Sequence, residues 1–455
     1  MSIGMPYRKS PRWCLLLAIG AAATVAGCTL MPRGARTLQR QAVLAGRPFL
    51  KSPQKRYLPP LPALPGPQEL VRRALLNSPN VEAAYWRWRA AIEVIAQRGA
   101  EMTVPALGAT TDLKNGAASY GNAMLQLADM SSAPIEWPSK PLAEARAALQ
   151  KAYAAGWQYR RAQFAVRRQT LDAWYKLVAD SAMLDLLRRD AVLLRELNAF
   201  ARAHIEAGAA SPTAALTIEN RLTRLHARMT AVSAELLADR AALNRVIGRP
   251  VRRPLRVPEK LPSTALPPGN LTRMLTLAVR RNPDLAALRR DVRAGRIDVE
   301  RAKMNYIPDF DLSAGTSLDG ITQNFGGAIM FPFVRYHAIN AAIRQNRDSL
   351  RESEAELRST RLSVAARVMA DLVMAQSDAR KIELYESVFL PRLERLAAFA
   401  RTEVEQNRAA IDGPVQIERT QVQIHETILE LRLDEAERQA DMDDLTATRL
   451  EDAEY

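Results

Sequence analysis

The side chains that most often carry chemistry are few in this 455-residue chain, and their spacing excludes the common catalytic sites. No histidine lies in an HExxH motif or in another spacing typical of metal ligands. A glycine-rich phosphate loop, a GxSxG motif and a clustered pair of acids are also missing from the sequence. We therefore expect no enzyme activity, no metal and no cofactor. The four histidines are His204, His226, His337 and His425.

The two cysteines, Cys14 and Cys28, both lie near the start of the chain and provide no disulfide framework. Basic residues come first, a short apolar segment follows, and small residues precede Cys28, which is typical of a secretory signal. The residues Val25-Ala26-Gly27-Cys28 resemble a bacterial lipoprotein box, with Val25 in place of the usual leucine. The basic residues are Arg8, Lys9 and Arg12.

The lipoprotein box implies that residues 1–27 are removed and that the thiol of Cys28 carries a covalent lipid, palmitate included. Thr29 follows the cysteine, and the lack of Asp at that position favours the outer membrane over the inner one. An ordinary signal peptide with a chance cysteine is the alternative. Residues 28–68 contain eight prolines. Because proline fixes φ and lacks an amide donor, we expect an extended tether, not a helix.

The formal net charge of +15 comes from 64 basic and 49 acidic residues. Such a charge suggests nucleic acid or an anionic membrane as a partner. Acids are interspersed among the bases, however, and no basic block is accompanied by aromatic residues for base stacking. We therefore interpret most charges as solvated helix faces and expect no nucleic-acid partner.

The chain contains two copies of one unit. The residues around Asn77-Ser78-Pro79 resemble those around Arg281-Asn282-Pro283, and three pairs of prolines lie 204, 203 and 202 positions apart. We predict a first repeat over 69–250, a linker over 251–270 and a second repeat over 271–450. The proline pairs are Pro79 and Pro283, Pro105 and Pro308, and Pro212 and Pro414.

Each repeat contains a stretch almost free of helix breakers. Residues 142–206 lack proline, and residues 336–406 contain only Pro391. A helix of that length would extend roughly 100 Å, which favours a coiled coil or a helical tube. Apolar residues recur at helical spacing. Examples are Ile382, Tyr385, Phe389, Leu393, Leu396 and Ala400, and also Val415, Val422 and Leu429.

Strand-like segments lie between the helices. From Phe310 to Leu318 apolar and polar residues alternate, and a second candidate strand runs from Ile321 to Phe333. Phe331 and Phe333 are candidates for an aromatic girdle. The corresponding segments of the first repeat, 104–113 and 121–130, alternate poorly, so short soluble strands remain the alternative there.

The order of these features resembles the TolC-type outer-membrane factor family, also called outer membrane efflux proteins. The duplication, Asn-Pro-Asp-Leu at 282–285, Tyr-Ile-Pro-Asp-Phe at 306–310 and the proline after Phe389-Leu390 carry the resemblance over about 69–450. The stretch 85–91, Tyr-Trp-Arg-Trp-Arg-Ala-Ala, is similar to the heavy-metal-efflux branch.

The resemblance implies a mainly α fold with membrane β-structure. Three chains would share a 12-stranded β-barrel, with four strands from each chain, and a coiled-coil helical tube would extend into the periplasm. The shorter helices, about 69–100 with 213–247 and 284–303 with 415–448, would stack end to end beside the long ones. The expected location is the outer membrane of a Gram-negative-type bacterium.

The resemblance also implies partners. A periplasmic adaptor protein would contact the turns between helices, here Gly208, Ala209 and Ser211 in the first repeat and Asn407 and Arg408 in the second. The second turn departs from the family pattern, because Asn407 stands where glycine is expected. An inner-membrane pump, expected to be of the resistance-nodulation-division type, would supply the energy.

Three acids near the second-repeat strands are candidate lumen residues. Asp309, Asp311 and Asp319 share the polar face, so three chains would form rings of carboxylates that favour cations. Solvated acids without a selectivity role are an equal alternative. For the whole chain we weigh three functions: a passive efflux duct for small solutes or metal ions, a type I protein-secretion duct, and a non-conducting coiled-coil envelope lipoprotein.

Overall fold

The computed structural model describes residues 30–100, 108–110, 113–114, 117–118, 124–126, 137–206, 212–262, 270–317, 323–406 and 412–448. The chain divides into two compact units, each assembled from separate stretches. The first unit contains residues up to 45, 86–156 and 287–357, and the second contains 46–85, 157–286 and the residues from 358 onward. Among the described residues, no helix is both long and apolar enough to cross a membrane.

Helices account for most of the described chain, in agreement with its long stretches almost free of proline. The predicted long helix over 142–206 is confirmed by α5, which has 68 residues. The predicted single helix over 69–100 is two helices, because Pro79 starts a new one. The helices are α2 (Ala35–Ala45), α3 (Pro67–Asn77), α4 (Pro79–Ala100), α5 (Ser139–Glu206), α6 (Pro212–Val246), α7 (Leu271–Arg281), α8 (Pro283–Lys303), α9 (Tyr336–Leu384), α10 (Leu390–Glu405) and α11 (Asp412–Thr446).

A π-helical turn, Tyr385–Phe389, lies between α9 and α10, so the long stretch over 336–406 is helical but not uniform. The amide of Leu390 donates to the carbonyl of Tyr385, five residues earlier. In a regular α-helix the ring of Pro391 would clash with the carbonyl four residues before it. The wider turn relieves that clash, and the helix therefore continues past the proline.

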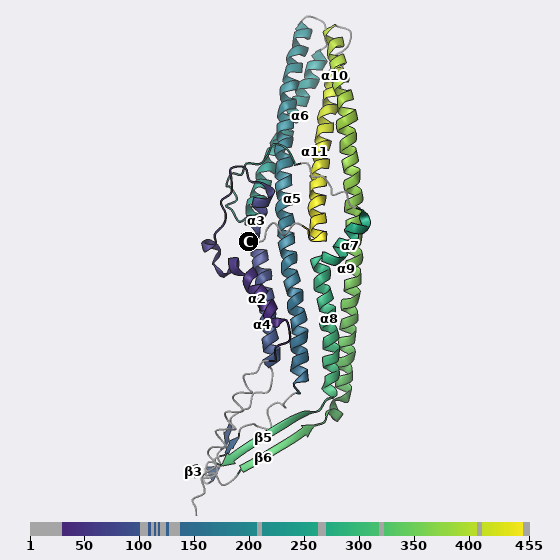
Figure 1. Ribbon diagram of the computed structural model, residues 1–455. Helices are drawn as coiled ribbons and strands as arrows, with labels where there is room; N and C mark the ends of the chain where they lie inside the picture. Colours follow the sequence, from purple (N-terminus) through teal and green to yellow (C-terminus); the bar gives the residue numbers. More distant parts are fainter. Residues whose placement is uncertain are drawn as a thin grey trace, which may run out of the picture. The chain divides into compact units, whose positions relative to one another are not determined.

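A four-stranded antiparallel sheet lies in the first unit, in the order β1-β4-β5-β6. The two strands of the second repeat, β5 (Asp309–Ser317) and β6 (Gln323–Met330), confirm the predicted strands there and are the long arrows in Figure 1. Strand β4 (Met124–Gln126) comes from the first repeat and pairs with β5, with Leu125 opposite Thr316. The sheet therefore combines strands from both repeats.

The first-repeat strands are shorter than the segments predicted for them. Strand β1 (Gly108–Thr110) pairs with β4, while β2 (Leu113–Lys114) and β3 (Ala117–Ala118) form a separate small hairpin. Their poor alternation of apolar and polar residues agrees with this shortness, because alternation is what specifies a half-buried strand.

The extended tether predicted over 28–68 is wrong for residues 35–45, which form α2 with Ala35, Leu38 and Ala42 buried. No proline lies between Pro32 and Pro48, so nothing in that stretch opposes a helix. Before the helix, the amide of Leu30 donates to the carbonyl of Gly99 over 3.1 Å. The segment is therefore packed onto the first unit.

The second unit is held by an apolar cluster to which α5, α6, α10 and α11 all contribute. Side chains at helical spacing on each helix form the cluster, as expected for packed amphipathic helices. Its buried members are Met183, Leu184, Leu187, Ala191, Leu194, Ala201, Ile218, Leu225, Val232, Val404 and Val415.

Helix ends at corresponding positions of the two repeats make the same backbone hydrogen bonds. The amide of Ser78 donates to Ala74, and the amide of Asn282 donates to Ala278, each just before a proline that starts the next helix. Just after α6 and α11, Gly248 and Ala447 have φ of 66° and 50°. In both places the amide of this residue donates to the carbonyl three residues earlier, and the next amide donates to the carbonyl five residues before it. A duplicated unit predicts such matched ends.

Candidate functional site at the helix–strand junction

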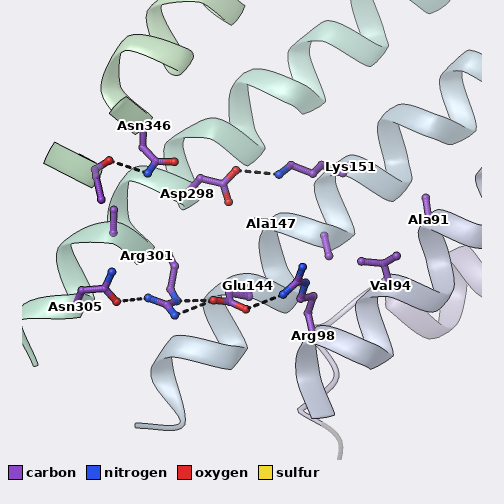
Figure 2. Close-up of a pocket in the computed structure, with 13 residues that line it drawn as sticks. Ala91, Val94, Arg98, Glu144, Ala147, Lys151, Asp298, Arg301, Asn305 and Asn346 are labelled. Atoms are coloured by element: carbon purple, nitrogen blue, oxygen red, sulfur yellow. Dashed lines mark hydrogen bonds and ion pairs between the residues drawn. The ribbon is translucent and has the colours of Figure 1, made fainter. Parts of the chain in front are cut away.

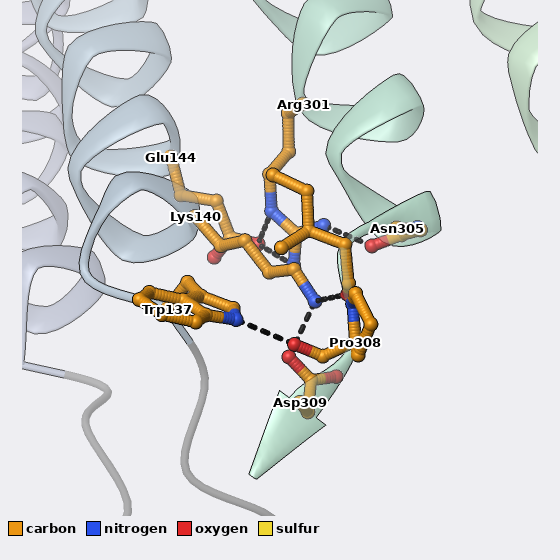
Figure 3. A network of polar contacts seen from close by, with 8 residues as sticks. Trp137, Lys140, Glu144, Arg301, Asn305, Pro308 and Asp309 are labelled. Carbon is orange, nitrogen blue, oxygen red and sulfur yellow. Dashed lines mark hydrogen bonds and ion pairs between the residues drawn. The ribbon is translucent and has the colours of Figure 1, made fainter. Parts of the chain in front are cut away.

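A buried lysine holds the point where β5 begins. Lys140, in the first turn of α5, is 1% exposed, and its Nζ donates to Asp309 Oδ1 over 2.5 Å and to the Ile307 carbonyl over 3.1 Å. Trp137 Nε1 donates to the Pro308 carbonyl over 2.5 Å, as Figure 3 shows. A buried ammonium group requires such partners. The motif Tyr-Ile-Pro-Asp-Phe is therefore clamped to the start of α5.

One turn further along α5, Glu144 connects three helices. It accepts from Arg301 of α8 over 2.8 Å and pairs with Arg98 of α4 at 3.8 Å. Arg301 also donates to Asn305, close to the start of the strand (Figure 3). The junction is thus held by a network of charge-assisted hydrogen bonds, which position neighbouring elements more strictly than apolar contacts do.

A groove of about 650 Å³ lies beside this network (Figure 2). Small apolar side chains form much of its wall, and five charged side chains line it: Arg98, Glu144, Lys151, Asp298 and Arg301. Each of the five has a partner of opposite charge, and Lys151 pairs with Asp298 at 3.0 Å. The groove therefore carries three cations against two acids, because Arg98 and Arg301 share Glu144. Among the described lining residues, no nucleophile is paired with a general base.

Of the three candidate lumen acids, only the side chain of Asp309 is described, and it is the partner of Lys140. Asp311 lies in β5 opposite Ala328, and Asp319 lies outside the described residues. The ion pair compensates the charge of Asp309. Lys140 has no distinguishing signal in the sequence, because it is a lone lysine among many charged residues.

The remaining candidate residues lie outside the described part of the chain: Cys28, Gly208, Ala209, Ser211, Asn407 and Arg408. The flanking helices are described: α5 ends at Glu206 and α6 begins at Pro212, while α11 begins at Asp412. Acylation and adaptor contact therefore stay predictions.

The Asn-Pro-Asp-Leu motif has a structural role in the second unit. Asn282 Oδ1 accepts from the amides of Asp284 and Leu285 over 3.0 and 3.1 Å, and its Nδ2 donates to the Leu445 carbonyl over 3.2 Å. It therefore caps the start of α8 and fixes the end of α11, and Pro283 occupies the first helical position that proline favours.

Residues 274–445 match the family model described as outer membrane efflux protein. Over this segment the chain is similar to the outer membrane efflux protein family. The match covers most of the second repeat, including Asn282, the β5–β6 pair and the π-helical turn. The resemblance inferred from the sequence is thereby confirmed. A comparison with curated protein sequences gives no significant match.

Solved structures show that the similarity in fold extends well beyond the matched segment. The outer-membrane channel OprN is 14% identical, with a TM-score of 0.72 over 88% of this chain and 95% of that one. VceC, an outer membrane protein of Vibrio cholerae, is 16% identical, with a TM-score of 0.71 over 84% of this chain and 95% of that one. CusC, whose structures concern transmembrane channel formation, is 16% identical, with a TM-score of 0.70 over 84% of this chain and 91% of that one. The TolC-like fold is therefore established.

Proposed function

We propose that the chain is the outer-membrane duct of a tripartite efflux system, a passive conduit that exports small solutes or metal ions. Three copies would form the conduit, each contributing two strands from each repeat to a 12-stranded barrel. The sheet order β1-β4-β5-β6, which combines strands of both repeats, is the observation that carries this proposal. The family match of residues 274–445 supports it.

Exposed apolar side chains on α9, the π-helical turn and α10 support assembly with further copies. Leu362, Met369 and Val373 recur at spacings of seven and four, as in a coiled-coil seam. Of the predicted stripe, Ile382 and Leu393 are buried within the chain, but Phe389 and Leu396 are exposed. An apolar face of this kind indicates an interaction surface. We infer that it packs against a second copy.

The N-terminal segment supports the proposed lipid anchor. Leu30, two residues after Cys28, is hydrogen-bonded to Gly99 near the end of α4, the helix that precedes the first-repeat strands. Exposed aromatic side chains also lie around the start of β5 and the end of β6, as expected at a membrane–water interface. They are Trp137, Tyr306, Phe331 and Tyr336. A lipid on Cys28 would join the chain close to that interface.

Cation preference remains part of the proposal, with Asp311 and Asp319 as the acids that face the lumen. Asp309 contributes less in this proposal, because Lys140 compensates its charge. The residues around 207–211 and 407–411 would contact the adaptor, and a proton-driven pump in the inner membrane would supply energy.

Reconstitution of the purified, lipid-modified protein in planar bilayers tests the duct. We expect discrete single-channel conductance and a trimer by native mass spectrometry. A trimer without conductance would favour the non-conducting envelope lipoprotein and contradict the duct. Restored export of small toxic solutes, but not of a secreted protein, in a strain lacking its own duct would separate efflux from type I secretion.

A further inference from the structure

Three ionisable side chains lie among the apolar side chains that hold the second unit together. Asp190 of α5 is 4% exposed and adjoins Ala191 of the apolar cluster, while Glu418 of α11 is 5% exposed and follows Val415 by one turn. Arg221 of α6 places Nη2 3.5 Å from Asp190 Oδ1, and its Nη1 donates to the Val415 carbonyl over 2.7 Å. The group therefore connects three helices.

The charges of this group do not balance when both acids are ionised. Two carboxylates would face the guanidinium of Arg221, and the only other cation facing Glu418 among the described residues is the exposed Arg401 of α10. Asp190 and Glu418 are close enough that the Asp190 carboxylate raises the pKa of Glu418, and two carboxylates that share one site do not readily ionise together. Within the described chain, no nitrogen or hydroxyl donor reaches either Glu418 oxygen.

We propose that Glu418 is a proton-binding site that fastens the first turns of α11 to α5 and α6. With the proton bound, the Asp190–Glu418–Arg221 group is neutral and the helices pack closely. When the proton leaves, two carboxylates repel each other in an apolar environment, and the start of α11 loosens. The inference goes beyond the proposed duct and does not depend on conduction.

The fold sets the pH range of this site. Burial, joined by the neighbouring Asp190 carboxylate, raises the pKa of Glu418 to about 7, although Arg221 and Arg401 act in the opposite direction. Because the folded protein binds this proton more tightly than a solvated glutamate does, docking is strongest in acid and weakens as pH rises toward and through neutrality. The start of α11 at Asp412 is only six residues away.

Hydrogen–deuterium exchange of the full-length protein in detergent tests the proposal, after correction for the intrinsic pH dependence of exchange. Between about pH 5.5 and pH 8, protection of the 412–424 amides should fall at least about tenfold in the wild type, since one pKa unit is a factor of ten. In the Glu418→Gln variant, these amides should keep the protection of the acid state at both pH values. Glu430→Gln changes an exposed glutamate of the same helix and should behave like the wild type.

Asp190→Asn gives a second, independent variant. It leaves one acid opposite Arg221, so Glu418 should ionise at a lower pH. Protection of the 412–424 amides should then be constant between about pH 5.5 and pH 8. Infrared difference spectra should show the band of a protonated carboxyl in the wild type at about pH 5.5 and its loss in Glu418→Gln. A wild type without pH dependence, or a Glu418→Gln variant that keeps it, would overturn the proposal whether or not the protein conducts.

Discussion

At the residue scale, the junction relies on a few polar side chains with several partners each. Lys140 has two acceptors and Asn282 has three hydrogen bonds, and each side chain connects elements that are distant in the sequence. Both are buried. Buried polar groups of this kind contribute most to stability when every hydrogen-bond partner is present, because a buried group without its partner keeps its full desolvation cost.

Replacing Lys140 with Met should lower stability by about 2–4 kcal/mol, because a half-buried Asp309 loses its cation. The double change Lys140→Met/Asp309→Asn should recover part of that loss. Lys151→Met, on the same helix but at the more exposed pair with Asp298, should cost less than about 1 kcal/mol. Thermal unfolding followed by circular dichroism measures all three. Equal losses for the two lysines would contradict the clamp.

Asn282→Ala should destabilise the protein by about 2–3 kcal/mol, since it removes a helix cap and leaves the Leu445 carbonyl without its donor. Asn270→Ala is a matched control, because Asn270 caps α7 through one exposed hydrogen bond to Thr272. That change should cost about 1 kcal/mol. Chemical unfolding curves of the two variants provide the comparison, and a larger effect at Asn270 would refute the role given to Asn282.

The matched helix ends predict substitutions with opposite effects. Ala447→Gly should stabilise the protein by up to about 1 kcal/mol, because Ala447 has a left-handed φ that glycine adopts without strain. Gly248→Ala should destabilise it by more than that, since a Cβ would lie 1.8 Å from Asn77 Nδ2. Melting temperatures of both variants test the pair.

At the element scale, the π-helical turn depends on one residue. Pro391→Ala restores an amide donor and removes the ring clash, so residues 385–389 should become regular α-helix and stability should rise by about 1–3 kcal/mol. A cryo-EM map of the variant would show the pitch of this turn directly. A π-helical turn that persists without the proline would mean that packing, not Pro391, causes it.

The sequence predicts elements whose signal is local. Long helices follow from missing breakers, and β5 and β6 follow from alternation. The sequence does not predict α2 over residues 35–45, because the prolines on either side dominate the composition, although α2 itself contains none. Lys140 and the Asp190–Glu418 pair have no local signal, since their role depends on residues far away in the chain. The clamp and the proton site therefore required the structure.

At the scale of the whole molecule, stability should depend on pH through buried acids of the second unit. Burial is the largest cause that raises the pKa of Asp172 to about 7, and burial together with Asp239 raises the pKa of Asp180 to about 7. The folded protein thus holds more protons than the unfolded chain between about pH 4 and 7, so these acids favour the folded state less as pH rises.

The melting temperature should therefore be higher at about pH 5.5 than at pH 8, where these carboxyls are ionised. Asp180→Asn should reduce the difference between the two melting temperatures, because the amide side chain is neutral at both pH values, as the protonated acid is. Differential scanning calorimetry of the detergent-solubilised protein measures it. A higher melting temperature at pH 8 would show that other groups dominate.

The segment before the first repeat is packed onto the folded body of the chain. Leu30 is bonded to Gly99, three side chains of α2 are buried, and Phe49 lies 5.3 Å from the ring of Tyr85. A shortened gene that starts at residue 69 would leave the surfaces under this segment uncovered and prone to aggregation. Recombinant production, and any transplant of the lipid anchor to another protein, should therefore keep residues 30–68 together with the repeats.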